Sequence, residues 1–215
     1  MKNAFAGVLV VVIILSPVAV AGQSFLTLHG GLNVTTLGSD NPINRDSRAG
    51  LNIGGSVYLP ISDNLGATLG LAYSEKGAKG NEEGTQLTFA LDYFEVPALL
   101  TVGIPHEGPV GAHVFVGPAV GLRVGCEASL DDSVLGSVFE STISNCSEVE
   151  GGFNTFDLGV VGGFGVSLET IDVTLSLDLL YNLGLTSVGE PGDSQPAHDT
   201  KNRAFTIRVG AGFSL

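Results

Sequence analysis

The strongest constraint in this sequence is an alternation of apolar and small or polar residues, which recurs in eight segments after residue 22. A period of two is typical of a β-strand with one apolar face, whereas an amphipathic helix repeats every 3.6 residues. At about 9 to 16 residues, the segments are long enough to cross a bilayer at a tilt, which takes about 9 to 11. The expected strands span 26–34, 51–59, 65–74, 87–102, 112–125, 156–168, 173–183 and 205–215.

The fourth segment changes its parity part-way along. Apolar residues occupy odd positions from Leu87 to Leu91 and even positions from Phe94 to Val102. One extra residue near Tyr93 and Phe94 would return the apolar side chains to one face, as a β-bulge does. We therefore predict a bulge at this point of the fourth strand.

The strand face opposite the apolar one, here called the second face, indicates by its composition whether the apolar face points to lipid or into the barrel. The chain has 31 glycines and only 14 % charged residues, and its second face consists mostly of Gly, Ser, Thr and Asn. A soluble barrel would need charge on its outside, whereas the lumen of an eight-stranded barrel has room for little more than small side chains. We predict an all-β, eight-stranded antiparallel up-and-down transmembrane β-barrel with its apolar face in lipid. A soluble lipocalin-like barrel is the alternative, and it would be recovered from the aqueous phase.

The few charges on the lumen parity are of mixed sign. An unpaired charge is costly in a closed lumen, so these acids and bases are expected to pair there. We interpret the set as a structural network that fixes strand register, with no aqueous pore; a functional polar channel is the alternative. The predicted network comprises Lys76, Asp92, Glu95, Arg123, Asp157, Asp178 and Arg208.

The first 22 residues are typical of an export signal. Lys2 precedes an apolar run over 8–15, and the small-x-small triplet at 19–21 follows a Ser-Pro break at 16–17. We predict a signal peptide over 1–22 and a barrel domain over 23–215. An uncleaved anchor is the alternative, but a membrane span needs about 20 mainly apolar residues.

Export would place the two cysteines, Cys126 and Cys146, in an oxidising compartment. Pairing is the default there, and a disulfide between them would stabilise the enclosed loop by about 3 kcal/mol in the chain-entropy model. We predict the Cys126–Cys146 disulfide, with two free thiols as the alternative.

Long and short links alternate between the expected strands. Long extracellular loops, short periplasmic turns and periplasmic termini make up the usual outer-membrane arrangement. The long links hold 13 acidic residues against four basic ones, and the whole chain carries a net charge of −13, which disfavours nucleic acid as a partner. The long links are 36–48, 77–84, 126–152 and 185–201, and the short ones are 61–64, 104–109 and 169–171.

Several runs of the sequence are similar to one known family. They span 73–80, 92–100, 117–121, 156–159, 181–185 and 201–205. With these runs the chain resembles the PorT-like outer-membrane β-barrel family of porin-type proteins. The resemblance implies the barrel fold, insertion into outer-membrane lipid by the barrel insertion machinery, and a role in assembling a secretion system.

No residue pattern points to catalysis or to a cofactor. The four histidines, at 29, 106, 113 and 198, lack metal-ligand spacing, and His29 and His113 fall on the lumen parity, where we expect satisfied core groups. Four loop acids could bind a divalent cation, but their spacing matches no known calcium loop, so we interpret them as solvated charge. They are Asp131, Asp132, Glu148 and Glu150.

Together these features predict a monomeric, non-enzymatic outer-membrane protein without cofactor or metal. It would act through its acidic extracellular loops in adhesion, surface protection or envelope integrity, on a loop partner that the sequence does not identify. A secretion-assembly factor of PorT type is one alternative. The other is an outer-membrane enzyme with a rim site, for which His198, Asp199 and Asp193 are the nearest candidates.

Overall fold

The computed structural model describes residues 23–38, 45–82, 85–132, 141–143, 154–187 and 200–215. The predicted signal peptide, 1–22, lies outside the described residues. No helix within the described ranges is long and apolar enough to cross a membrane.

The described chain is built from β-strands. Eight of them are long, from 11 residues in β8 to 23 residues in β5, and β6 has only three. The eight predicted strands are therefore confirmed, although several exceed the expected length. The strands are β1 (Phe25–Gly38), β2 (Arg45–Ser62), β3 (Leu65–Glu82), β4 (Thr85–Ile104), β5 (Val110–Asp132), β6 (Ser141–Ile143), β7 (Phe156–Glu169), β8 (Thr174–Gly184) and β9 (Lys201–Ser214).

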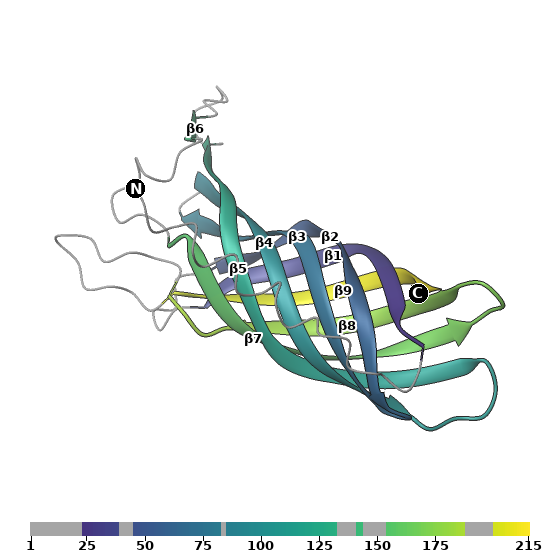
Figure 1. The fold of residues 1–215 in the computed structure, drawn as a ribbon. Coiled ribbons are helices and arrows are strands. Elements are labelled where there is room, and N and C mark those ends of the chain that lie inside the picture. The colour runs from purple at the N-terminus through teal and green to yellow at the C-terminus, as the bar shows by residue number, and fades with distance from the viewer. Residues whose placement is uncertain (1–22, 39–44, 83–84, 133–140, 144–153, 188–199) are drawn as a thin grey trace.

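The eight long strands form one closed antiparallel barrel (Figure 1). Each long strand pairs with the next along the chain, and β9 pairs with β1 to close the sheet. β6 adds to the outer part of β5 through Ala128 to Leu130. Closure leaves no unpaired sheet edge around the barrel wall, which is the condition for strands to cross a bilayer. The predicted fold class is confirmed.

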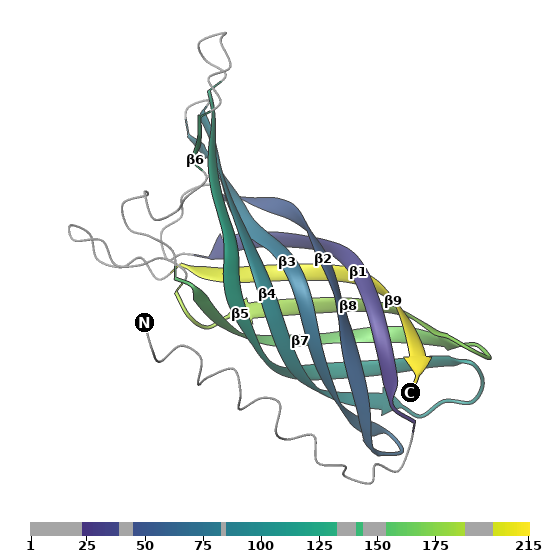
Figure 2. The ribbon, with the colours of Figure 1, turned by 45° about the horizontal axis from the view of Figure 1, so that its top comes forward.

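The two ends of the barrel differ. One end, the turn end, holds the short links 63–64, 105–109 and 170–173. Leu215 donates its backbone N–H to the carbonyl of Ser24 there, at 2.9 Å, so the first and last strands meet at this end. At the opposite end, the loop end, β3, β4 and β5 continue beyond the rest of the barrel (Figure 2).

The link 77–84 is not the long loop that we expected. β3 continues to Glu82 and β4 begins at Thr85, and the two pair throughout. Gly77 has φ of +136°, and a Cβ there would collide with the carbonyl oxygen of Phe89. Glycine therefore lets β3 continue through a segment whose polar sequence predicted a loop.

The apolar face of the strands points outward, as predicted. Leu28, Leu32 and Val209 are 57 %, 60 % and 62 % exposed. Similar side chains surround the barrel, an apolar surface that a water-soluble monomer rarely presents but lipid accommodates.

The parity change in β4 has a different cause from the one predicted. β4 stays in register with β3 without interruption, and Leu91 and Tyr93 are fully buried inside the barrel. The bulge lies instead in β5, where Tyr93 pairs with Arg123 and Asp92 pairs with Gly125, leaving an extra residue at Val124. Near the loop end, apolar residues of β4 thus fill the lumen rather than face lipid.

Candidate functional site

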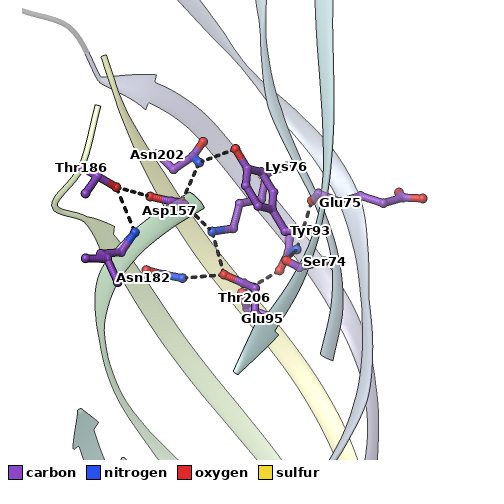
Figure 3. Close-up of polar contacts among 12 residues, drawn as sticks. Ser74, Glu75, Lys76, Tyr93, Glu95, Asp157, Asn182, Thr186, Asn202 and Thr206 are labelled. Atoms are coloured by element: carbon purple, nitrogen blue, oxygen red, sulfur yellow. Dashed lines mark hydrogen bonds and ion pairs between the residues drawn. The ribbon is translucent and has the colours of Figure 1, made fainter. Parts of the chain in front are cut away.

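The loop-side half of the lumen is filled by a buried ion-pair cluster centred on Lys76 (Figure 3). Lys76 Nζ lies 2.8 Å from Glu95 Oε1 and 3.5 Å from Asp157 Oδ2. The three charged side chains come from β3, β4 and β7 and are between 2 % and 11 % exposed. Lys76 Nζ also lies 5.2 Å from the ring centroid of Tyr93. One cation therefore holds two carboxylates that would otherwise repel each other in a dry lumen.

Neutral side chains supply further hydrogen bonds to the two carboxylates. Asn182 donates to Glu95 Oε1 at 3.0 Å, and Asn202 donates to Asp157 Oδ2 at 2.8 Å. Thr186 donates to Asp157 Oδ1 at 3.1 Å. We call the set Lys76, Tyr93, Glu95, Asp157, Asn182, Thr186 and Asn202 the plug.

A second set of bonds continues the buried layer toward β1. Asn33, which is 1 % exposed, donates to Ser74 Oγ at 2.9 Å and accepts a bond of 2.7 Å from Thr206 Oγ1. Thr35 donates to the carbonyl of Gly77 at 2.9 Å. Buried polar groups of β1, β3, β4, β7, β8 and β9 are thereby linked across the barrel, so the lumen is packed at this level.

An apolar layer covers the plug on its loop side. Leu37 and Ala78 form a buried cluster, at 6 % and 3 % exposed, and Leu91 is fully buried. Apolar cover of this kind keeps water from the ion pairs and strengthens the attraction between them.

A separate charged group lies nearer the turn end. Asp178 accepts a bond from Arg208 Nε at 2.9 Å and lies 3.0 Å from His113 Nε2. The Arg208 guanidinium also lies 5.9 Å from the Phe115 ring centroid. A Cβ on Gly165 would collide with Asp178 and His113, so glycine makes the room for this turn-end triad.

Below the turn-end triad the lumen opens into a cavity of about 290 Å³, which we call the vestibule. Its lining reaches from Asp63 and His106 in the turns to Asp178 and Arg208 in the wall. A much smaller cavity, about 40 Å³, lies on the plug side of Arg208. Of these two cavities, the one at the turn end is thus the larger.

His29 lines the vestibule and departs from its expected state. The side chain is 8 % exposed, and neither ring nitrogen has a hydrogen-bond partner in the described structure. His113, in contrast, has the carboxylate of Asp178 beside it. The expectation of a satisfied core group thus holds for His113 but not for His29.

Five of the seven members of the predicted charge network form two separate groups. Lys76, Glu95 and Asp157 form the ion pairs of the plug, and Asp178 and Arg208 form the turn-end triad with His113. Arg123 donates to the carbonyl of Asn154 at 3.3 Å. Asp92 lies on the outer face, because its neighbours Leu91 and Tyr93 point inward and side chains alternate along a strand.

Other candidate residues lie partly outside the described structure. Cys126 lies on β5, but Cys146 lies outside the described residues, so their disulfide stays a prediction. His198, Asp193 and Asp199 also lie outside them, as do Glu148 and Glu150. Among the residues that are described, no three His, Cys, Asp or Glu side chains are placed to hold a metal ion.

Comparison with known proteins assigns the family. A family model described as outer membrane protein β-barrel domain matches residues 22–189. The chain belongs to this family. It is thus a β-barrel protein of the bacterial outer membrane. A search of the curated proteins finds no sequence that matches the chain.

Solved structures of outer-membrane proteins share the fold. OprG of Pseudomonas aeruginosa is 11 % identical, with a TM-score of 0.51, over 90 % of this chain and 96 % of its own. A major outer membrane protein of Thermus thermophilus is 13 % identical, also with a TM-score of 0.51, over 90 % of this chain and 100 % of its own. At this identity the likeness concerns the barrel alone.

The charged lumen residues could be found from sequence, but the asparagines of the plug and its surroundings were missed. Asparagine is depleted in strands, so its repeated presence at lumen-facing positions was an available signal. The amide supplies two donors and an acceptor, which lets it join carboxylates and hydroxyls without adding charge. These residues are Asn33, Asn182 and Asn202.

Proposed function

We propose that this outer-membrane barrel is non-enzymatic and acts at the cell surface through its acidic loop end, in adhesion. The plug is the observation that carries the proposal. Lys76, Glu95 and Asp157 are almost fully buried where a pore would have to pass. A barrel packed in this way is suited to present its ends rather than to conduct solutes.

The charge distribution supports the choice of the loop end. The segments 36–48, 77–84, 126–152 and 185–201 together carry an excess of nine negative charges, and Glu127 is exposed on the part of β5 that reaches beyond the barrel. If the loop end lies at the cell surface, both termini lie in the periplasm and the acidic segments face outward. Such a surface attracts basic partners through a field that salt screens.

Adhesion can be tested on cells that carry the full-length protein in their outer membrane. We expect attachment to a basic protein surface to fall at least about fivefold when Glu127, Asp131 and Asp132 are changed together to their amides, and to fall likewise in high salt. A matched control changes Asp63, Glu107 and Asp172 in the turns, which leaves attachment unchanged. Equal loss in both triple variants, at equal surface levels, would count against a loop-end function.

An enzymatic rim site is the competing proposal, with His198 as its candidate base. Purified protein folded in lipid vesicles is expected to show no lipid or peptide hydrolysis above that of empty vesicles. Turnover by the wild type that is abolished in His198→Ala would overturn the non-enzymatic proposal.

A further inference from the structure

The vestibule has the size and lining of a small-molecule site. Its volume of about 290 Å³ lies close to the lower end of the ~300–1,000 Å³ usual for ligand pockets. Leu99, Phe115 and Tyr58 supply apolar and aromatic wall, and Thr27 and Ser176 supply hydroxyl groups. An apolar wall with a few polar groups is the common composition of a pocket that binds small organic molecules.

His29 gives this pocket an unused hydrogen-bonding group. Its two ring nitrogens and Asn202 Oδ1 are the buried side-chain atoms without a partner among the described residues, and of these two residues only His29 belongs to the vestibule lining. Burial of an unpaired polar group costs free energy, and a neutral imidazole offers one donor and one acceptor. A ligand group that both accepts and donates, such as a hydroxyl or an amide, would satisfy the ring.

The charges of the vestibule disfavour an anionic ligand. Asp178 is already shared by Arg208 and His113, so the pocket presents no uncompensated cation for an anionic ligand. Asp63 and Glu169 add negative charge at the turn-side part of the lining, which further disfavours anions. His29 is also not part of a metal-ligand group within the described residues.

We propose that the vestibule binds a small uncharged amphiphile, with one ring-sized apolar body against Leu99 and Phe115 and a hydroxyl or amide head at His29. The occupant enters from the turn end, where the lining reaches Asp63 and His106. This site is independent of the loop-end function proposed above.

The test uses 4-fluorobenzyl alcohol as the probe and fluorine NMR as the readout, with the full barrel in lipid nanodiscs. We expect saturable binding that unlabelled benzyl alcohol displaces, on top of linear partition into lipid. 4-Fluorotoluene, which lacks the hydroxyl head, should bind at least about tenfold more weakly, as expected for loss of one or two hydrogen bonds. Linear uptake alone would overturn the proposal.

Two leucine variants separate the pocket from the lipid. A Cβ at Gly103 meets nothing closer than Asn64 O at 3.9 Å, so Gly103→Leu fills the vestibule without a backbone clash. Gly162→Leu adds the same side chain to the outer face, where the nearest atom is Phe115 O at 4.0 Å. We expect saturable binding to be lost in the first variant and kept in the second. Equal binding in both would show that the probe does not occupy the vestibule.

Substitution of His29 tests the polar head. His29→Leu should weaken the alcohol at least about tenfold and leave 4-fluorotoluene unaffected, whereas His29→Gln, which keeps a donor and an acceptor, should restore part of the affinity. An unchanged affinity for the alcohol in His29→Leu would overturn the role assigned to this ring.

Discussion

The plug and the turn-end triad use the same chemistry in different surroundings. Lys76 in the plug is 2 % exposed and is held by two carboxylates, beneath an apolar layer. Arg208 in the triad is 11 % exposed and lies at the wall of an open cavity. An ion pair in a dry site depends wholly on its partners, whereas water can replace part of a lost contact at a wetter one. The difference shows that side chains pack the lumen at the plug, whereas the lumen beside the triad leaves room for the small molecule that we propose.

The largest expected effect comes from Lys76→Met. The change leaves Glu95 and Asp157 buried without their shared cation, and loss of one partner from a buried ion pair costs about 3–5 kcal/mol. We expect a loss of this size in the free energy of unfolding, measured by urea titration of protein folded in lipid vesicles.

Lys79→Met is the matched control on the same strand. Lys79 lies three residues along β3, on the opposite face from Lys76, and we expect a loss below about 1 kcal/mol. Comparable losses in both variants would mean that the plug is not a buried ion-pair cluster.

A smaller effect is expected from Asp178→Asn. The amide keeps the shape of the carboxylate but removes the charge that holds Arg208 and His113, and a hydrogen bond to a charged group contributes about 1.5–3 kcal/mol. Because the vestibule lies beside the triad, we expect the measured loss to stay below that of Lys76→Met in the same urea titration. A larger loss of free energy of unfolding than in Lys76→Met would contradict the proposal that the triad is the wetter of the two sites.

The sequence predicts the barrel well because its fold depends on alternation, which can be read residue by residue. Leu28, Leu32 and Val209 share the apolar parity, and all three face outward. The same rule misplaces Asp92. It assumes a bulge in β4, which would turn Asp92 into the lumen, whereas the bulge lies in β5 at Val124. A bulge on one strand changes its pairing with the neighbour, so its position depends on two strands and cannot be read from one.

The candidate site was only partly predictable for a related reason. Lys76, Glu95 and Asp157 could be chosen as lumen charges, but which acid pairs with which base depends on strand tilt and register around the closed barrel. The vestibule gave no sequence signal, since a cavity arises where small inward residues from several strands meet. Gly103, Ser176 and Thr27 are such residues, and they come from β4, β8 and β1.

The most direct test of the closed and open halves is the reactivity of single cysteines with a charged, membrane-impermeant thiol reagent. Ser176→Cys places a thiol in the vestibule, and Ser74→Cys places one in the buried layer beside the plug, where Ser74 is 1 % exposed. Both are made with Cys126→Ser and Cys146→Ser, and each protein is folded in nanodiscs.

We expect Ser176→Cys to react at least about 100-fold faster than Ser74→Cys, because reaction at the buried site requires local opening of the packed lumen, at a cost of about 3 kcal/mol. Similar rates at the two positions would contradict the claim that the lumen is closed toward the loop end and open toward the turn end.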